Sequence, residues 1–229
     1  MHSTPSLFVI ALPRSLSTVV YEQCAAALDL RMPAWTSAGE ILNGDRLVLT
    51  HAEDGGLKFT PPGRAVEFTR IRRFLDDVVQ PTGVAYKDVV QPFVVADWLR
   101  DRRLPVLRIE RPLADVAFAF ERAGWRYPMQ AASAHGDDTE RLLRGLARAA
   151  RALAAVRAVT LDFDAAIDDD TALRDALAQL YPQRDIAPLR YRDDAFVAYA
   201  RTVRERRRHP RWLLLDARLR ELDEGATVD

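Results

Sequence analysis

Short apolar runs alternate along this chain with longer stretches in which apolar residues recur at helical spacing. Residues 7–12 (LFVIAL) are continuously apolar and are followed by Pro13, a pattern typical of a buried strand. A helix is predicted to follow at once, because the hydroxyl-rich stretch 15–18 supplies capping candidates and apolar residues recur at helical intervals from Val20 onward. The chain is therefore expected to begin with a tight strand-to-helix turn.

The same alternation continues to residue 180 and predicts the fold class. Further strands are predicted at 84–86, 105–109 and 159–163, and helices within 63–80, at 93–102, after Pro112, at 140–155 and at 172–180. Residues 31–62 are predicted to be loops with a short helix or strand at 47–49, residues 133–139 a polar loop, and residues 168–170 an acidic loop. Strands separated by helices favour a three-layer α/β/α fold around a central, mostly parallel sheet. With no linker or repeat, residues 1–229 are expected to form a single domain.

Composition limits the partners that such a domain could hold. The 229 residues are 48% hydrophobic, and 33 basic residues balance 33 acidic ones, so no overall field favours a nucleic acid. Any bound anion must therefore be held by a local group of positive charges. Only two of the basic residues, Lys58 and Lys87, are lysines. A lone cysteine, Cys24, and the lack of an export signal or membrane-spanning stretch predict a cytoplasmic protein.

The turn at residues 13–18 (PRSLST) is the first candidate site, because ligands of parallel sheets bind at the carboxyl ends of the strands. It places the Arg14 guanidinium, several hydroxyls and the free amides of a helix N-terminus around one point. A phosphate would fit there, although an ordinary capped helix would explain the same residues. The Gly-Lys-Ser/Thr ending of the nucleoside-triphosphatase loop is absent.

In its context, the stretch LFVIALPRSLSTVVYE resembles the phosphosulfate-binding loop of sulfotransferases that use 3′-phosphoadenosine 5′-phosphosulfate. That loop is an apolar strand, then Pro-Arg/Lys-Ser-Gly-Ser/Thr-Thr, then a helix. A second stretch, VLRIERPLADVAFAF, resembles the family's 3′-phosphate block, with Arg111 and Pro112 after a strand and Asp115 four residues beyond the arginine. Two positions depart from the pattern, since Leu16 replaces the usual glycine and Ala119 the usual serine.

The resemblance implies a fold like that of the P-loop nucleoside triphosphatases. It also implies transfer of a sulfuryl group from that donor to a hydroxyl or amine of a small-molecule acceptor, with no metal. On this reading the donor's 5′-phosphosulfate is held by the loop residues, and its 3′-phosphate by Arg111, with Arg122 a substitute for the missing serine. The implied loop residues are Arg14, Ser15, Leu16, Ser17 and Thr18.

The implied transfer also requires a catalytic base to take the acceptor proton. Residues 37–43 (SAGEILN) resemble a Gly-Glu-x-x-Asn stretch of bacterial members of the family, some of which use the glutamate, so Glu40 is the first candidate. His51 is its rival, since imidazole needs little pKa adjustment to act as a base. Lys87 ends a predicted strand at the same edge, where family members often carry a lysine near the transferring sulfate. The arginine run at 204–211 is interpreted as a solvated helix face, or as a surface that reaches the nucleotide.

Two other classes of function stay open from the residues. One is a degenerate nucleotide-binding or protein-interaction module that has lost transfer activity, as Leu16 and Ala119 would allow. The other is a phosphoryl-transfer, kinase-like enzyme that uses the same turn. The acceptor and the oligomeric state are not predicted.

Overall fold

A computed structural model describes residues 4–33, 39–42, 65–125, 138–189 and 191–225. Its described strands form a parallel sheet in the order β2-β1-β3-β4, so that β1 and β3 lie at its centre. The strands are β1 (Leu7–Ala11), β2 (Ala85–Asp88), β3 (Val106–Glu110) and β4 (Val159–Asp162). Each matches a predicted apolar run to within a few residues.

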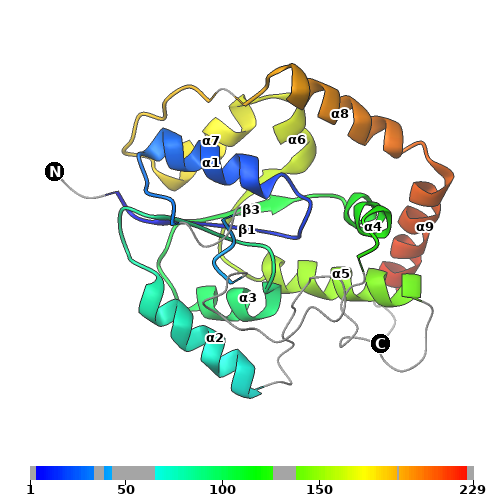
Figure 1. Ribbon diagram of the computed structural model, residues 1–229, viewed down its shortest axis with the longest axis horizontal. Coiled ribbons are helices and arrows are strands. Elements are labelled where there is room, and N and C mark those ends of the chain that lie inside the picture. Colours follow the sequence, from blue (N-terminus) through cyan, green and yellow to red (C-terminus); the bar gives the residue numbers. More distant parts are fainter. Residues whose placement is uncertain (1–3, 34–38, 43–64, 126–137, 190, 226–229) are drawn as a thin grey trace.

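Helices connect the strands and cover both faces of the sheet, which confirms the predicted three-layer α/β/α architecture (Figure 1). The helices are α1 (Ser17–Leu28), α2 (Ala65–Val78), α3 (Pro92–Arg100), α4 (Leu113–Arg122), α5 (Asp138–Ala154), α6 (Phe163–Asp168), α7 (Thr171–Leu180), α8 (Asp194–Arg206) and α9 (Pro210–Gly225). None of these helices is long and apolar enough to cross a membrane.

Alternation along β1 divides the core into two halves. Leu7, Val9 and Ala11 are buried with the inner side chains of α1, α6, α7 and α8. Phe8 and Ile10 point to the opposite face and are buried with α2, α3, α4, α5 and α9. The strand is apolar throughout because both of its faces are covered by helices.

Three local expectations are corrected by the structure. No side chain caps α1, since its N-cap position is Leu16 in a left-handed conformation rather than one of the hydroxyl residues. The chain from 163 to 168 is helix α6, with Asp162 accepting a hydrogen bond from the Ala165 amide at 2.8 Å. The arginine run at 204–211 is divided between two helices, because α8 ends at Arg206 and α9 begins at Pro210. The predicted element at 47–49 lies outside the described residues, as do residues 133–137 of the predicted polar loop, whereas residues 138 and 139 begin helix α5.

Candidate functional site

The strand order creates a switch point between β1 and β3. From β1 the chain reaches β2 on one side, and then crosses to β3 on the other side, so the connections that leave β1 and β3 diverge. Open α/β sheets bind their ligands in the crevice that such divergence leaves at the carboxyl ends of the strands. The loop at residues 13–16 follows β1, and Arg111 follows β3, so both predicted binding blocks meet this point.

The β1–α1 loop has an unusual backbone. Arg14 and Leu16 both adopt positive φ angles, of 66° and 60°, a region that costs a non-glycine residue on the order of 1 kcal/mol or more. The first turn of α1 has no side-chain cap, which leaves its backbone amides to meet another acceptor. Ser15 is fully buried, and its hydroxyl has no hydrogen-bond partner among the described residues. The loop therefore offers amides, an unpaired hydroxyl and the positive end of a helix dipole at one place.

Arg111 joins the two strand ends. Its Nη1 donates a hydrogen bond to the backbone carbonyl of Arg14, and its Nε lies 3.4 Å from Oδ2 of Asp115. The guanidinium also stacks over the Phe163 ring at 4.3 Å, and only 4% of the side chain is exposed. Arg111 thus braces the loop from β3. Arg14 itself is exposed, and its guanidinium lies over the ring of Trp125 at 5.2 Å.

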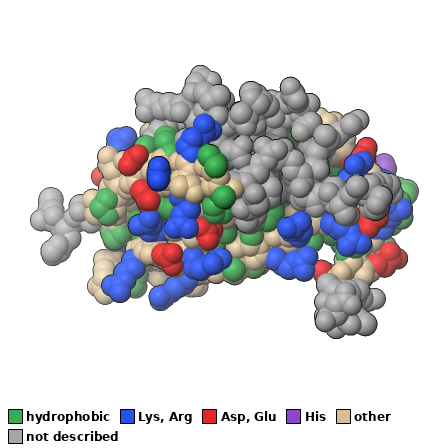
Figure 2. Space-filling view, turned by 90° about the horizontal axis from the view of Figure 1, so that it is seen from below, with side chains coloured by type: hydrophobic (Ala, Val, Ile, Leu, Met, Phe, Trp, Pro, Cys, Tyr) green, Lys and Arg blue, Asp and Glu red, His purple; other side chains and the backbone are tan. Residues whose placement is uncertain are grey.

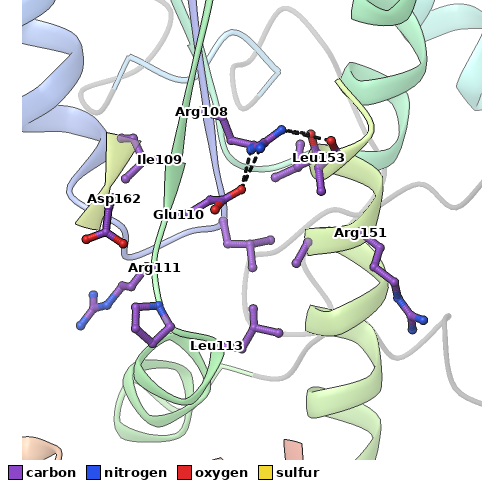
Figure 3. Close-up of a pocket in the computed structure, with 12 residues that line it drawn as sticks. Arg108, Ile109, Glu110, Arg111, Leu113, Arg151, Leu153 and Asp162 are labelled. Carbon is purple, nitrogen blue, oxygen red and sulfur yellow. Dashed lines mark hydrogen bonds and ion pairs between the residues drawn. The ribbon is translucent and has the colours of Figure 1, made fainter. Parts of the chain in front are cut away.

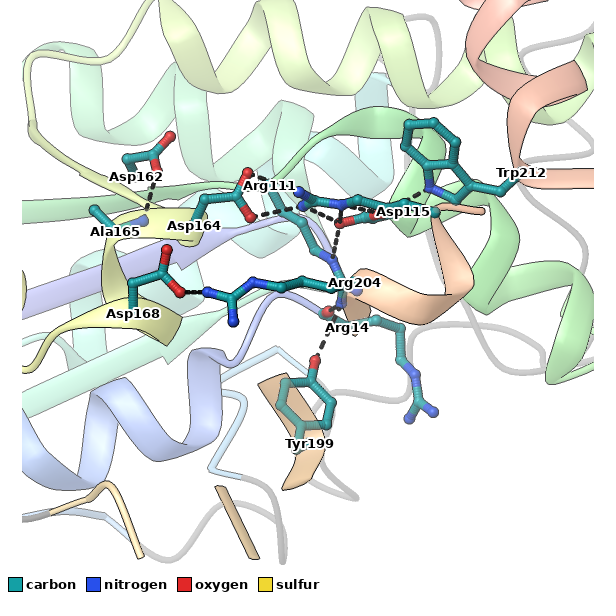
Figure 4. A network of polar contacts seen from close by, with 11 residues as sticks. Arg14, Arg111, Asp115, Asp162, Asp164, Ala165, Asp168, Tyr199, Arg204 and Trp212 are labelled. Carbon is teal, nitrogen blue, oxygen red and sulfur yellow. Dashed lines mark hydrogen bonds and ion pairs between the residues drawn. The ribbon is translucent and has the colours of Figure 1, made fainter. Parts of the chain in front are cut away.

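Asp115 is the centre of a polar network that reaches the C-terminal helices (Figure 4). Its carboxylate accepts hydrogen bonds from Arg207 at 2.6 Å and from the Trp212 indole at 2.7 Å. Arg207 also bonds Asp164 at 2.7 Å, and these partners, Asp115 first, raise the pKa of its guanidinium. The interpretation of the arginine run as a solvated face is therefore wrong for Arg207. Two further members are paired, since Arg204 bonds Asp168 and Arg211 bonds Glu121.

Arg206 lies in a different environment, among other cations. Burial lowers the pKa of its guanidinium, and the charges of Arg122, Arg111 and Arg14 lower it further. Its Nε is buried and has no hydrogen-bond partner among the described residues. These guanidinium groups concentrate positive charge at the switch point of a chain without net charge.

Lys87 brings β2 to the same site. Its side chain is fully buried, and Nζ donates a hydrogen bond to Oγ1 of Thr18 at 2.8 Å and lies 3.0 Å from Oε1 of Glu40. The ring of Tyr21 lies 5.8 Å from the same ammonium group. Glu40 reaches this position because its short segment pairs with β2, where the Ile41 amide donates to the carbonyl of Lys87 at 2.9 Å.

Asp88 is a residue of this site that sequence reasoning missed. It is buried at the end of β2 and accepts hydrogen bonds from the amides of Leu42, Val90 and Gln91. Burial raises its pKa to about 7, against the opposing effect of these hydrogen bonds. The available sequence signal was an aspartate between a strand and the Pro92 that opens the next helix, because aspartate side chains commonly accept backbone amides in such turns.

A cavity of about 450 Å³ lies beside the switch point, between β3 and α5 (Figure 3). Its lining is mostly apolar and includes Leu12, just after β1, and Leu113 on α4. Arg108 and Glu110 form an ion pair at 2.8 Å on one wall, and Arg111 also belongs to the lining.

The structure gathers most of the predicted site residues at one edge of the sheet. Thr18, Glu40 and Lys87 are in direct contact, and Arg14 and Arg111 are hydrogen-bonded to each other. His51, the rival base, lies outside the described residues.

Comparison with known proteins finds a likeness in structure. No protein-family model matches the sequence, and no curated protein matches it. Among solved structures, the chain is similar to a sulfotransferase domain from the curacin biosynthetic pathway. The TM-score is 0.48 and the identity is 12%, over 84% of this chain and 80% of that one.

Proposed function

We propose that this protein is a sulfotransferase that uses 3′-phosphoadenosine 5′-phosphosulfate and acts on a hydroxyl or amine of a small molecule. The observation that carries the proposal is the contact of Lys87 with both Thr18 and Glu40. This contact joins the first turn of α1, directly after the loop at residues 13–16, to a buried cation and a carboxylate. These are the groups that transfer of an anionic group to a protonated acceptor requires.

The residues of the loop fit the donor's phosphosulfate end. The first turn of α1 has no side-chain cap, and the Ser15 hydroxyl has no hydrogen-bond partner among the described residues, so a phosphate or sulfate oxygen would serve both as an acceptor. The left-handed conformation of Leu16 is the one that glycine adopts freely at the corresponding family position. Leucine is therefore compatible with the same loop path, at a cost in backbone strain.

A second anionic group of the donor would meet the cluster at the end of β3. Arg206 and Arg122 are mutually repulsive, and Arg14 and Arg111 add to the positive charge. A bound 3′-phosphate would relieve this repulsion, because its charge favours every guanidinium nearby. In this arrangement the buried Arg111 braces the loop, and Arg122 and Arg206 face the phosphate.

The donor supplies a sulfuryl group on a good leaving group, and the protein's residues supply position and charge. In the proposed reaction the acceptor oxygen or nitrogen forms a bond to sulfur as the bond from sulfur to the 5′-phosphate oxygen breaks. Glu40 takes the acceptor proton. Lys87 and Arg14 stabilise the negative charge that appears on the departing phosphate. Thr18 orients Lys87 through their 2.8 Å hydrogen bond.

Ligand binding and turnover test this function. We expect adenosine 3′,5′-bisphosphate to raise the melting temperature, and a panel of alcohols, phenols and amines to include an acceptor that becomes sulfated. Stabilisation by ATP with magnesium, and none by the bisphosphate, would favour the phosphoryl-transfer alternative. Stabilisation by neither would favour an interaction module without transfer activity.

A further inference from the structure

Glu40 lies in a short segment that is hydrogen-bonded to the end of β2. Its segment, residues 39–42, is described between two stretches that are not, 34–38 and 43–64. Within it, the Ile41 amide donates to the Lys87 carbonyl at 2.9 Å, and the Leu42 amide donates to Oδ2 of Asp88 at 3.1 Å. The side chains of Ile41 and Leu42 are buried in the core, but apolar packing is not directional. The direction of the segment therefore depends on its hydrogen bonds to the end of β2.

Asp88 connects this segment to α3 through two different oxygens. Oδ2 accepts from Leu42, and Oδ1 accepts from the amides of Val90 and Gln91, both at 2.8 Å, where α3 begins. Lys87 precedes Asp88 and points to the opposite face of the sheet, toward Thr18 and Tyr21. Two successive residues of β2 thus contact the Glu40 segment. Lys87 contacts the carboxylate of Glu40, and Asp88 contacts the backbone amide of Leu42.

We propose that Asp88 is a positioning residue, which holds Glu40 against Lys87 by accepting the Leu42 amide and does so only as a carboxylate. The inference rests on the proposed function of Glu40 as the base. Protonation turns one oxygen of the carboxyl into a donor and a weaker acceptor, so it weakens the hold on at least one of the amides that surround Asp88. Because the amides of Val90 and Gln91 share the other oxygen in the turn before α3, the single bond to Leu42 is the one that we expect to be lost.

The charges around Asp88 set the pH at which this loss occurs. Burial raises its pKa to about 7, and the negative charge of Glu40 raises it too. The start of α3 contributes only amides, and the Lys87 ammonium lies across the strand in its ion pair with Glu40. Asp88 is therefore expected to change its protonation near neutral pH, which makes the position of Glu40 sensitive to pH in that range.

Asp88→Asn is the sharpest variant, because asparagine keeps one acceptor oxygen. That oxygen can still accept from Val90 and Gln91, whereas the amide nitrogen would face the Leu42 N–H as a second donor. The start of α3 is preserved and the contact with the Glu40 segment is broken. Asp169→Asn is the matched control, since Asp169 likewise accepts a backbone amide, that of Thr171 at 2.9 Å, before a helix far from Glu40.

Amide hydrogen exchange at Leu42, corrected for intrinsic rates, tests the positioning without any need for activity. In Asp88→Asn we expect exchange at Leu42 to become about tenfold faster or more, with β1 and Asp169→Asn unchanged. In the unmodified protein the same acceleration is expected as the pH falls below about 7. Unchanged Leu42 exchange in the variant, or no pH effect in the unmodified protein, would overturn the proposal.

Kinetics separate positioning from a merely structural effect. We expect Asp88→Asn to lower kcat by about tenfold with less than a threefold change in the KM for the sulfate donor, and to remove the fall in kcat below about pH 7. A wild-type pH profile in the variant would count against the role of Asp88. Failure of the unmodified protein to transfer sulfate would instead refute the proposed function, and the exchange measurement would still decide whether Asp88 holds the segment.

Discussion

Glu40 and Lys87 come from segments far apart in the sequence and meet as a buried ion pair, with Oε1 and Nζ 3.0 Å apart. The Lys87 side chain is 0% exposed and that of Glu40 is 9% exposed. Breaking such a pair leaves an uncompensated buried charge, which costs more than the pair itself contributes.

Lys87→Met should therefore lower the unfolding free energy by about 3–5 kcal/mol. Adding Glu40→Gln to it should restore part of that loss, because no unpaired carboxylate is left. Urea unfolding of both single variants and the double variant measures this coupling. Additive losses would show that the two side chains do not interact.

The brace between β3 and the loop predicts a combined effect of Arg111→Ala. The variant loses the hydrogen bond to Arg14 and leaves Asp115 with fewer partners, so we expect a loss of about 3 kcal/mol in stability. The affinity for adenosine 3′,5′-bisphosphate should fall more than that for adenosine 5′-monophosphate, as titration calorimetry would show. Arg108→Ala, which removes another arginine of β3, is the control for the nucleotide titrations. Equal losses of affinity for the two nucleotides would mean that Arg111 does not contribute to binding of the 3′-phosphate.

Arg206→Gln should have opposite effects on stability and on ligand binding. In the folded protein the pKa of Arg206 is lowered by burial and by neighbouring arginines, so its charged form is disfavoured there. Removing the charge should leave the melting temperature unchanged or higher, and should weaken bisphosphate binding by about tenfold or more. Arg201→Gln, at an exposed position of the same helix, should change neither. Bisphosphate affinity retained in Arg206→Gln would remove Arg206 from the anion site.

The backbone at Leu16 predicts an order among substitutions. At φ 60° glycine relieves strain of about 1 kcal/mol, which offsets the lost packing of a partly buried leucine, so Leu16→Gly should be close to neutral. Leu16→Val should lose more than about 1 kcal/mol, because a β-branched side chain tolerates this region poorly. Thermal unfolding of both variants compares them, and a more stable valine variant would contradict the left-handed conformation.

Asp88 predicts how stability changes with pH. Its pKa is raised from 3.8 to about 7 by burial, so its contribution to stability is fully present below pH 4 and is lost as the pH rises to 7. The unfolding free energy of the wild type, relative to Asp88→Asn, should fall by about 4 kcal/mol across that window and stay level above it. Denaturant titrations at several pH values measure the difference. A flat difference between the two proteins would mean that Asp88 keeps an ordinary pKa.

Much of the fold was predictable because its signals are local. The apolar run before Pro13 specifies β1, and helical periodicity identifies α5 and α7 to within a few residues. The predictions that failed also concern local structure. Leu16 stands at the start of α1 where a hydroxyl was expected to cap, because the loop takes a left-handed path that intrinsic preferences disfavour. Helix α6 was not predicted, because one short turn carries little periodicity.

The sequence by itself determined the succession of strands and helices as far as residue 180, except for α6, and it identified Arg14, Glu40, Lys87 and Arg111 as candidates, since hydrophobic spacing and short motifs depend on neighbouring residues. Only the tertiary structure decided which of them meet. Strand order and packing bring Glu40 onto β2, place Asp88 under the Leu42 amide, and turn Arg207 into the partner of Asp115. Those contacts join residues far apart along the chain, and no local pattern encodes such distances.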